Sequence, residues 1–326
     1  MLSIKRIALP LILLVSAGTL SAQPKTESER YKAMADKVQV FYNAARYDSI
    51  FPLLSPEMKK VMPEKQSVAF FSGLHTHAGR IVRREFVDYK ATVAFYKLTF
   101  EKAVFSFELA LDEHTQINRF LLAPYKDPNL PVLTRNVTPM ILPFEGEWGV
   151  FWGGDTQAQN YHVAFDAQKG AFDFIVLGEG DKPYKTNGQT NEDYYAFGQP
   201  LYAPCDGEVI AALDGVEDNV PGKMNKVQVL GNSVVIKTSK NEYLFFAHFK
   251  KGSLKVTKGQ KVTQGQLLGL CGNSGHSSQP HLHFHIQNVE DANVATGAKC
   301  YFDRLVVNGE SKTDYSPVRG DKVQRP

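Results

Sequence analysis

A short segment near the end of the chain carries a histidine at every second position. Residues 281–286 read HLHFHI and follow a Gly-, Asn- and Ser-rich turn that ends at Pro280. Because side chains alternate between the two faces of a β-strand, His281, His283 and His285 share one face and the apolar residues between them share the other. The pattern predicts a strand whose apolar face packs on a core and whose other face presents imidazoles about 7 Å apart.

Histidines arranged in this way suit a metal site. Imidazole is the commonest protein ligand for zinc, and two rings on one strand can divide metal binding and proton transfer between them. The alternative is a surface strand with three incidental histidines. The remainder of the chain favours the metal site, because it supplies the further ligands that such a site needs.

The length and composition indicate an ordinary globular protein. The 326 residues suffice for two domains, each with its own core, and 43% hydrophobic and 22% charged residues are typical values. The net charge of +3 is too small to indicate a nucleic-acid partner. We therefore expect no nucleic-acid binding.

The N-terminus predicts export. Residues 1–22 have a basic start with Lys5 and Arg6, an apolar run over 7–15 and small residues up to Ala22. This is the anatomy of a secretory signal peptide, and we expect cleavage near Ala22 and a periplasmic or extracellular mature protein. The apolar run is shorter than the roughly 20 residues that span a bilayer, so we expect no transmembrane anchor in the mature protein.

The three cysteines show no pattern that indicates a catalytic or metal-binding role. Cys205, Cys271 and Cys300 are too few for a disulfide scaffold, and their number is odd. One disulfide with one free thiol and three buried free thiols are both compatible with the sequence.

Residues 23–123 predict an α+β domain with helices packed on a curved antiparallel sheet. Apolar residues first recur at helical spacing, and Ser55 followed by Pro56 is typical of a helix start. Apolar and polar residues then alternate over 94–100 and 105–111, which indicates half-buried strands, and 117–122 adds another. The order of elements resembles the small domains of the nuclear-transport-factor-2-like superfamily. We expect this accessory domain to position or regulate its neighbour.

The second half of the chain predicts an all-β domain. Residues 124–147 are rich in Pro, Asn and Thr and are expected to connect the domains, and 148–310 then contain short strands separated by turn residues. An antiparallel sandwich or open barrel is the expected architecture. The loops at 178–198 and 216–231 are expected to border the active cleft. Residues 311–326 are expected to form a poorly ordered polar tail.

Two carboxylates compete as partners of the histidines. A hairpin of strands 161–165 and 171–177 would place His162 opposite Asp173 or its neighbour, with Asp166 in the turn. Asp173 also interrupts an apolar strand, where a carboxylate costs free energy unless it has a partner. Asp173 is therefore favoured over Asp166.

Several short motifs then resemble those of the lysostaphin-like zinc endopeptidases of bacterial cell walls. The resemblance covers about half of the chain, in the same order throughout, and its last block is specific to that family. The motifs are NYH at 160–162, AFDF at 171–174, YAP at 202–204, FAH at 246–248, GNSG at 272–275 and PHLHF at 280–284.

The resemblance implies roles for individual residues. His162, Asp173 and His283 would bind one zinc ion per chain, His281 would be the general base and His248 the second catalytic histidine. The more usual family spacing places the aspartate four residues after the first histidine, which keeps Asp166 open as the alternative. His285 stands where another polar residue is expected, so its role is open.

The implied activity is hydrolysis of peptide bonds in peptidoglycan stem peptides or cross-links. Zinc lowers the pKa of its bound water to about 7, His281 would accept a proton from that water, and His248 would stabilise the developing oxyanion. A catalytically silent cell-wall binding or activator module is one alternative. Such a module would be expected to lack ligand or catalytic residues, whereas this chain has all three ligand residues and both catalytic histidines. An exported protease that acts on non-wall proteins is another.

Overall fold

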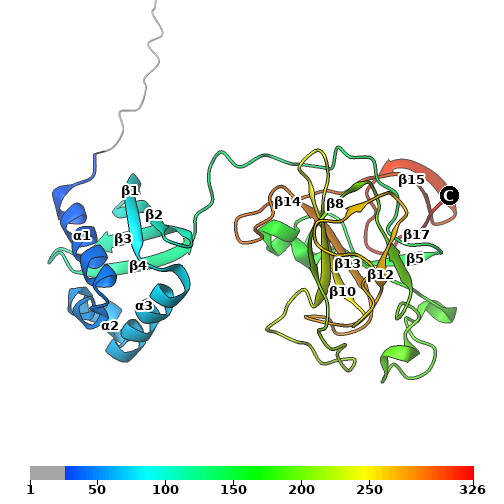
Figure 1. The fold of residues 1–326 in the computed structure, drawn as a ribbon, viewed down its shortest axis with the longest axis horizontal. Coiled ribbons are helices and arrows are strands. Elements are labelled where there is room, and N and C mark those ends of the chain that lie inside the picture. Colours follow the sequence, from blue (N-terminus) through cyan, green and yellow to red (C-terminus); the bar gives the residue numbers. More distant parts are fainter. Residues whose placement is uncertain (1–25) are drawn as a thin grey trace, which may run out of the picture. The chain divides into compact units, whose positions relative to one another are not determined.

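A computed structural model describes residues 26–326, so the predicted signal peptide lies outside the described residues. The chain divides into two compact units, with the boundary between Tyr125 and Lys126 (Figure 1). Among the residues that the structure describes, no helix has the length and apolar character needed to cross a membrane.

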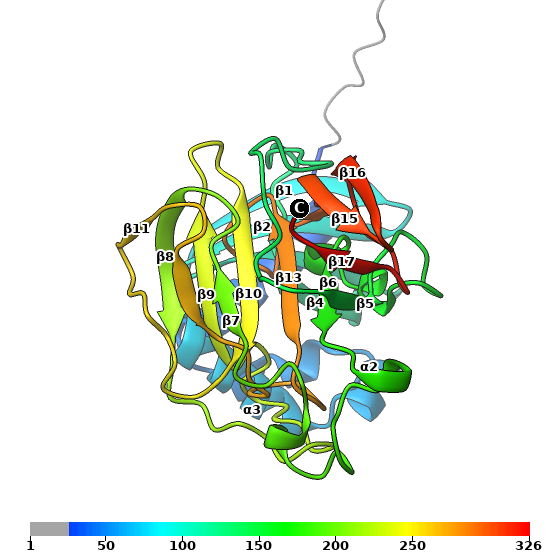
Figure 2. The same ribbon diagram turned by 90° about the vertical axis from the view of Figure 1, so that its right-hand side faces the viewer.

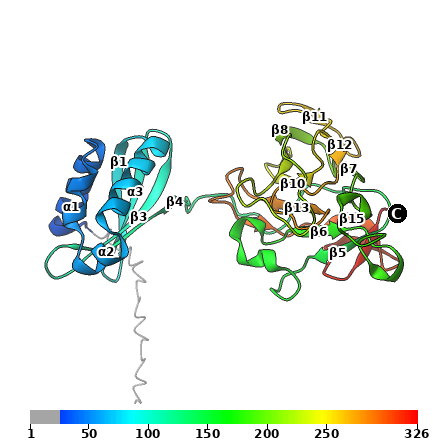
Figure 3. The same cartoon turned by 90° about the horizontal axis from the view of Figure 1, so that it is seen from below.

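The N-terminal unit combines helices with a four-stranded antiparallel sheet, which confirms the predicted α+β class. The sheet has the order β1-β2-β3-β4. Figure 3 shows α1 and α3 alongside it. The elements are α1 (Glu29–Asn43), α2 (Pro56–Val61), α3 (Glu64–Ala78), β1 (Ile81–Lys90), β2 (Val93–Phe100), β3 (Val104–Leu111) and β4 (Ile117–Pro124), with short 3-10 turns at Tyr47–Ser49 and Phe51–Leu53.

The alternation expected from the sequence builds the core of this unit. Every second residue of β2 is buried, from Ala94 to Phe100, and these side chains pack with the apolar stripe of α1, including Met34 and Val38. Ser55 caps α2 as predicted, because its hydroxyl accepts a hydrogen bond from the Met58 backbone N–H at 3.2 Å.

The C-terminal unit is built almost entirely from β-strands, which confirms the all-β prediction. An 11-stranded sheet follows the order β11-β8-β9-β10-β13-β6-β5-β17-β15-β16, with β14 paired to β13, and β12 pairs separately with β7. Figure 2 shows β10 and β13 side by side in this sheet. The strands are β5 (Trp148–Trp152), β6 (Phe172–Ile175), β7 (Pro200–Tyr202), β8 (Gly207–Leu213), β9 (Asn232–Lys237), β10 (Tyr243–Phe249), β11 (Lys261–Val262), β12 (Leu267–Leu270), β13 (Leu282–Gln287), β14 (Gly297–Ala298), β15 (Phe302–Val307), β16 (Glu310–Tyr315) and β17 (Lys322–Gln324).

Two segments expected to lie outside the cores belong to the C-terminal unit. Met140, Leu142 and Phe144 of the expected connecting segment are fully buried in its hydrophobic core. The expectation of a poorly ordered tail after residue 310 is wrong, because β16 pairs with β15 and β17 pairs with both β15 and β5. Val323 of β17 is a buried member of the core, so its burial outweighs the polar composition of the surrounding tail.

The predicted hairpin around residue 166 is also wrong. Residues 161–165 are not a strand: the chain forms η3 (Tyr161–Ala164) and η4 (Asp166–Gln168), two 3-10 turns. A short apolar run bounded by turn residues is too short to show a period. The sequence pattern therefore cannot distinguish a strand from a 3-10 turn at these residues. Further 3-10 turns are η5 (Glu179–Asp181) and η6 (Asn191–Asp193).

Candidate metal centre

Strand pairing places Asp173 opposite His283. Strand β13 lies between β10 and β6, and its Cα register pairs His283 with Ala247 on one side and with Asp173 on the other. Leu282, Phe284 and Ile286 face away from the histidines into the core, as the alternation predicted. The site is therefore fixed to the middle of a sheet.

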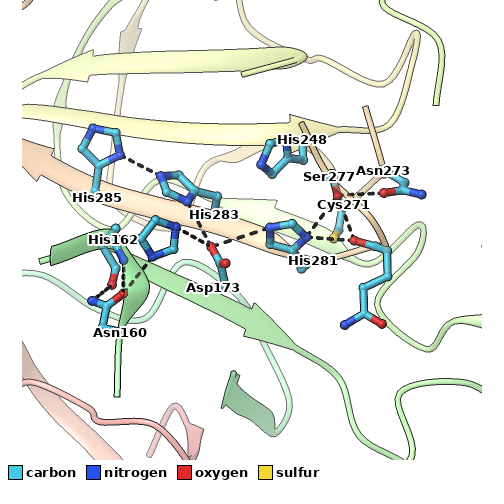
Figure 4. Close-up of polar contacts among 12 residues, drawn as sticks. Asn160, His162, Asp173, His248, Cys271, Asn273, Ser277, His281, His283 and His285 are labelled. Carbon is cyan, nitrogen blue, oxygen red and sulfur yellow. Dashed lines mark hydrogen bonds and ion pairs between the residues drawn. The ribbon is translucent and has the colours of Figure 1, made fainter. Parts of the chain in front are cut away.

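The carboxylate of Asp173 lies at the centre of the site. Its Oδ1 lies 3.0 Å from Nδ1 of His283, 3.6 Å from Nε2 of His281 and 3.7 Å from Nε2 of His162 (Figure 4). Asp173 is 6% exposed and alternates along β6 with Phe172 and Phe174, whose side chains are buried in the core. A carboxylate buried in such surroundings needs positive charge or hydrogen-bond donors around it.

His162 reaches the site from η3, and Asn160 fixes its orientation. The Asn160 side-chain oxygen accepts hydrogen bonds from the His162 backbone N–H at 3.2 Å and from the ring Nδ1–H at 2.8 Å. The Asn160 amide nitrogen donates to the Ala171 carbonyl at 2.9 Å, which sets which end of the amide faces the ring. The lone pair of His162 therefore resides on Nε2, the atom that faces Asp173. Asn160 belongs to the NYH motif at 160–162, but the sequence assigns no role to it.

The residues present fit a metal ion. One ligand atom from each of His162, Asp173 and His283 lies within 4.8 Å of the other two, and all three residues are buried. Burial lowers the pKa of His162 to about 3 and that of His283 well below its usual value, so both imidazoles are neutral and hold lone pairs at neutral pH. Ligands about 2.0–2.2 Å from a tetrahedral zinc ion stand roughly 3.3–3.6 Å apart. The spacings of 3.0 and 3.7 Å to Asp173 Oδ1 are of that size.

His281 borders this cluster with one ring nitrogen already bonded. Its Nδ1 lies 2.8 Å from the Gln279 carbonyl and 3.2 Å from the Ser277 hydroxyl. Because the carbonyl can only accept, Nδ1 carries a proton, and Nε2 points toward Asp173. The His281 side chain is 12% exposed and lines a hollow at the site.

His248 lies on the other side of His281. It lies within a bulge of β10, adopts a φ of +69° and has its ring centroid 4.7 Å from that of His281 and 6.0 Å from that of His283. Its Nδ1 donates to the Ser274 carbonyl at 2.7 Å. Burial lowers the pKa of His248 well below its usual value, so Nε2 is an acceptor in the resting state. The structure thus gathers all five favoured site residues in one place.

Asp166, the alternative carboxylate, lies outside the cluster. Its side chain is 64% exposed and forms ion pairs with Lys169 at 2.6 Å and Lys126 at 3.7 Å. The hydrogen bond from Lys169 is the main reason why the pKa of Asp166 is lowered.

His285 is buried in a hydrogen-bonded row behind His283. Its Nδ1 lies 2.9 Å from Nε2 of His283, and its Nε2 lies 3.1 Å from Oε1 of Gln287. The ring stacks on Phe245, with centroids 4.8 Å apart and an interplanar angle of 9°. Burial lowers the pKa of His285 to about 4. The sequence placed His285 on the correct face but gave no partner for it.

Two hollows flank the histidines. One of about 390 Å³ has Tyr161, Phe165 and Val229 among its walls, and the other, of about 220 Å³, has Trp152 and Met224. Both reach His248 and His283. The predicted loop at 216–231 contributes Met224, Lys226, Val229 and Leu230, whereas no residue of the other predicted loop, 178–198, lines either hollow. The walls are largely apolar, as is typical of binding sites.

Comparison with known families identifies this region. Residues 190–295 match peptidase family M23. The chain carries a peptidase family M23 domain. This confirms the resemblance drawn from its motifs. His248, His281 and His283 lie within the matched residues of the M23 domain, whereas His162 and Asp173 precede them.

Curated relatives of the M23 domain share it over part of their length. Peptidoglycan DD-endopeptidase ShyA of Vibrio cholerae serotype O1 is 36% identical over 90 residues, which are 28% of this chain and 18% of ShyA. Glycyl-glycine endopeptidase ALE-1 of Staphylococcus capitis is 26% identical over 151 residues, which are 45% of this chain and 38% of ALE-1. The chain thus spans well under half the length of these relatives.

Solved structures similar to this chain include the antimicrobial peptidase lysostaphin from Staphylococcus simulans. It is 18% identical with a TM-score of 0.29, over 47% of each chain. In the N-terminal unit, residues 35–120 match a family described as a protein of unknown function, DUF3887.

The three cysteines are free and buried. Burial raises the pKa of the Cys205 thiol to about 12 and also raises the pKa of the Cys271 and Cys300 thiols, so none is a reactive thiolate.

Proposed function

We propose that the C-terminal unit is a zinc-dependent endopeptidase that hydrolyses peptide bonds in peptidoglycan stem peptides or cross-links. The observation that carries this proposal is the buried set of His162, Asp173 and His283 within an M23-containing unit. These three residues would hold one zinc ion, which supplies a Lewis acid that lowers the pKa of a water to about 7 and polarises the scissile carbonyl.

His281 is the proposed general base. Its Nδ1–H is held by the Gln279 carbonyl, so its Nε2 is the only ring atom free to accept a proton. That atom lies 3.6 Å from Oδ1 of Asp173 and so faces the proposed metal site. A histidine positioned there takes the proton of the attacking water and returns it to the leaving amine.

His248 is the proposed second catalytic histidine. Its hydrogen bond to the Ser274 carbonyl limits what the ring can offer to a substrate. Because Nδ1–H donates to Ser274, the neutral ring offers only an accepting Nε2 to the cleft. His248 therefore orients a substrate N–H or a water in the resting state. It can donate to an oxyanion only after it has taken up a proton during the reaction.

The proposed substrate class rests on the relatives. ShyA and ALE-1 are named as peptidoglycan DD-endopeptidase and glycyl-glycine endopeptidase, respectively. The open cleft with apolar walls on both sides of the histidines is compatible with an extended peptide that passes across the site. We also propose that the protein is exported after cleavage near Ala22, and that its N-terminal unit positions or regulates the peptidase.

The test is hydrolysis of purified sacculi by the full-length mature protein. We expect soluble fragments detectable by chromatography and mass spectrometry, loss of their release with a chelator and recovery on addition of zinc. His281→Ala serves as the inactive control. Release of fragments that a chelator does not reduce would contradict the metal mechanism.

A parallel incubation with an unfolded protein separates the alternatives. Cleavage of the unfolded protein but not of sacculi would indicate a protease that acts on non-wall proteins. Binding to sacculi without any cleavage, in a protein that retains zinc, would indicate a silent binding or activator module.

A further inference from the structure

The hydrogen-bonded row behind His283 has a fixed direction. Its outer end is Gln287, whose amide nitrogen donates to the carbonyls of Val289 at 2.6 Å and Glu290 at 3.0 Å. Because these carbonyls only accept, the amide nitrogen must face them and Oε1 must face His285. Gln287 thus presents an acceptor to the histidine row.

This acceptor determines the tautomer of His285. The Nε2 of His285 lies 3.1 Å from Gln287 Oε1 and therefore carries a proton. Both His285 and Gln287 are buried, and the flat stack on Phe245 leaves the ring in apolar surroundings that disfavour a charge. A neutral ring protonated at Nε2 has its lone pair on Nδ1.

The tautomer of His285 in turn determines that of His283. Its Nε2 lies 2.9 Å from the accepting Nδ1 of His285, so Nε2 of His283 carries the proton and Nδ1 carries the lone pair. That Nδ1 lies 3.0 Å from Oδ1 of Asp173. Two acceptors at this distance repel each other unless a cation lies between them.

We propose that Gln287 and His285 are positioning residues that set Nδ1 of His283 as its metal-binding atom, and this inference rests on the metal site of the proposed function. Hydrogen bonds to the second nitrogen of a ligand histidine orient the ring and raise its basicity. Here the imidazole of His285 accepts that hydrogen bond. The side-chain amide of Gln287, which is held by two backbone carbonyls, determines which nitrogen of His285 is the acceptor. His285 does not contact the cleft: it is 2% exposed and does not line either hollow.

The direct test is the protonation pattern of the full-length, zinc-loaded wild-type protein. Two-bond proton–nitrogen correlations in a ¹⁵N-labelled sample report which nitrogen of each ring carries hydrogen. We expect hydrogen on Nε2 of both His283 and His285. Hydrogen on Nδ1 of His283, or on Nδ1 of His285, would overturn the inference without the need for any variant.

Zinc affinity, measured by competition with a chromogenic chelator, gives a second readout. His285→Leu removes the acceptor with little change in size, and we expect a loss of affinity of about 10- to 100-fold. His285→Asn keeps an oxygen near the position of Nδ1 and is expected to restore most of that affinity. Gln287→Met, which removes the acceptor at the end of the row, is expected to weaken binding in the same direction.

Matched controls distinguish a failure of this inference from a failure of the proposed function. Phe245→Leu alters the apolar neighbour of His285 without removing a hydrogen bond, and it is expected to retain zinc affinity. Wild-type affinity in His285→Leu would overturn this inference alone and leave the proposed function intact. Failure of the wild-type protein to bind zinc would overturn the proposed function as well.

Discussion

Nδ1 of His283 and Oδ1 of Asp173 lie 3.0 Å apart on neighbouring strands, and the hydrogen bonds behind His283 leave both atoms as acceptors. The register of β13 against β6 brings these atoms together, so the pair is built into the sheet and does not depend on a mobile loop. His162 completes the group from a 3-10 turn held by Asn160.

Replacing Asp173 is expected to remove the metal, whereas replacing Asp166 is not. Asp173 is buried among three imidazoles, whereas Asp166 is a surface residue paired with lysines. We expect Asp173→Ala to purify without stoichiometric zinc and Asp166→Ala to keep one ion per chain, as measured by elemental analysis. Retention of zinc by Asp173→Ala would exclude the proposed ligand set.

Asn160 is expected to support zinc affinity without contacting the ion. Its side-chain oxygen holds Nδ1 of His162, so Asn160→Leu should weaken zinc binding by about 10- to 100-fold. Asn160→Asp retains the accepting oxygen and should be less affected. Equal affinities for the two variants in chelator competition would show that the hydrogen bond to His162 does not matter.

His281 is expected to matter for turnover and not for metal binding. Removal of a general base typically lowers kcat by about 10²- to 10⁴-fold, and we expect this of His281→Ala with zinc still bound. His276 is the matched control, since it is exposed and lines both hollows. His276→Ala should keep most of the activity on sacculi, and a comparable loss in both variants would argue against a specific role for His281.

The stability of the metal-free protein is expected to fall as the pH decreases below about 6.5. Burial lowers the pKa of His162 to about 3 and of His285 to about 4, and lowers that of His248 and His283 well below the usual value. At a pH between these lowered pKa values and the pKa of about 6.5 in the unfolded chain, these histidines bind protons in the unfolded chain but not in the folded one. Each such histidine therefore costs up to about 1.4 kcal/mol of unfolding free energy per pH unit.

Urea unfolding followed by tryptophan fluorescence measures this effect. Trp148 and Trp152 are the chain's two tryptophans, so the signal reports on the C-terminal unit. We expect a positive slope of stability against pH between 5 and 6.5, and a shallower one in His285→Asn. A flat wild-type profile would contradict the prediction.

The C-terminal strand is expected to be essential for the stability of its unit. Val323 pairs with Trp148 between β17 and β5 and is fully buried, so Val323→Ala should lower the free energy of unfolding by about 1–3 kcal/mol. Val227, which is 90% exposed, provides the control: Val227→Ala should change it by less than about 0.5 kcal/mol. The measurement is again urea unfolding, and equal midpoints for the two variants would contradict the packing of β17.

The sequence predicts which face of β13 carries the histidines but not all of the groups around them. The alternation in 281–286 was sufficient to assign the faces of the strand, because the period of two is a local property of the extended backbone. The cost of a charge within an apolar strand favours Asp173 over Asp166, and the structure places Asp173 beside the histidines and Asp166 on the surface. The hairpin offered as the reason was wrong, since Asp173 meets His283 across β6 and β13.

The sequence by itself determined the two classes of fold, the helix and strand periods and the short list of histidines. Only the tertiary structure decided which nitrogen of each ring holds the lone pair, that Asn160 and Gln287 set those nitrogens, and that residues 311–326 complete the large sheet. The physical reason is the range of the interactions. Backbone period and polarity are set by neighbours along the chain, whereas register, burial and hydrogen-bond direction depend on groups far apart in sequence, such as Asp173 and His283.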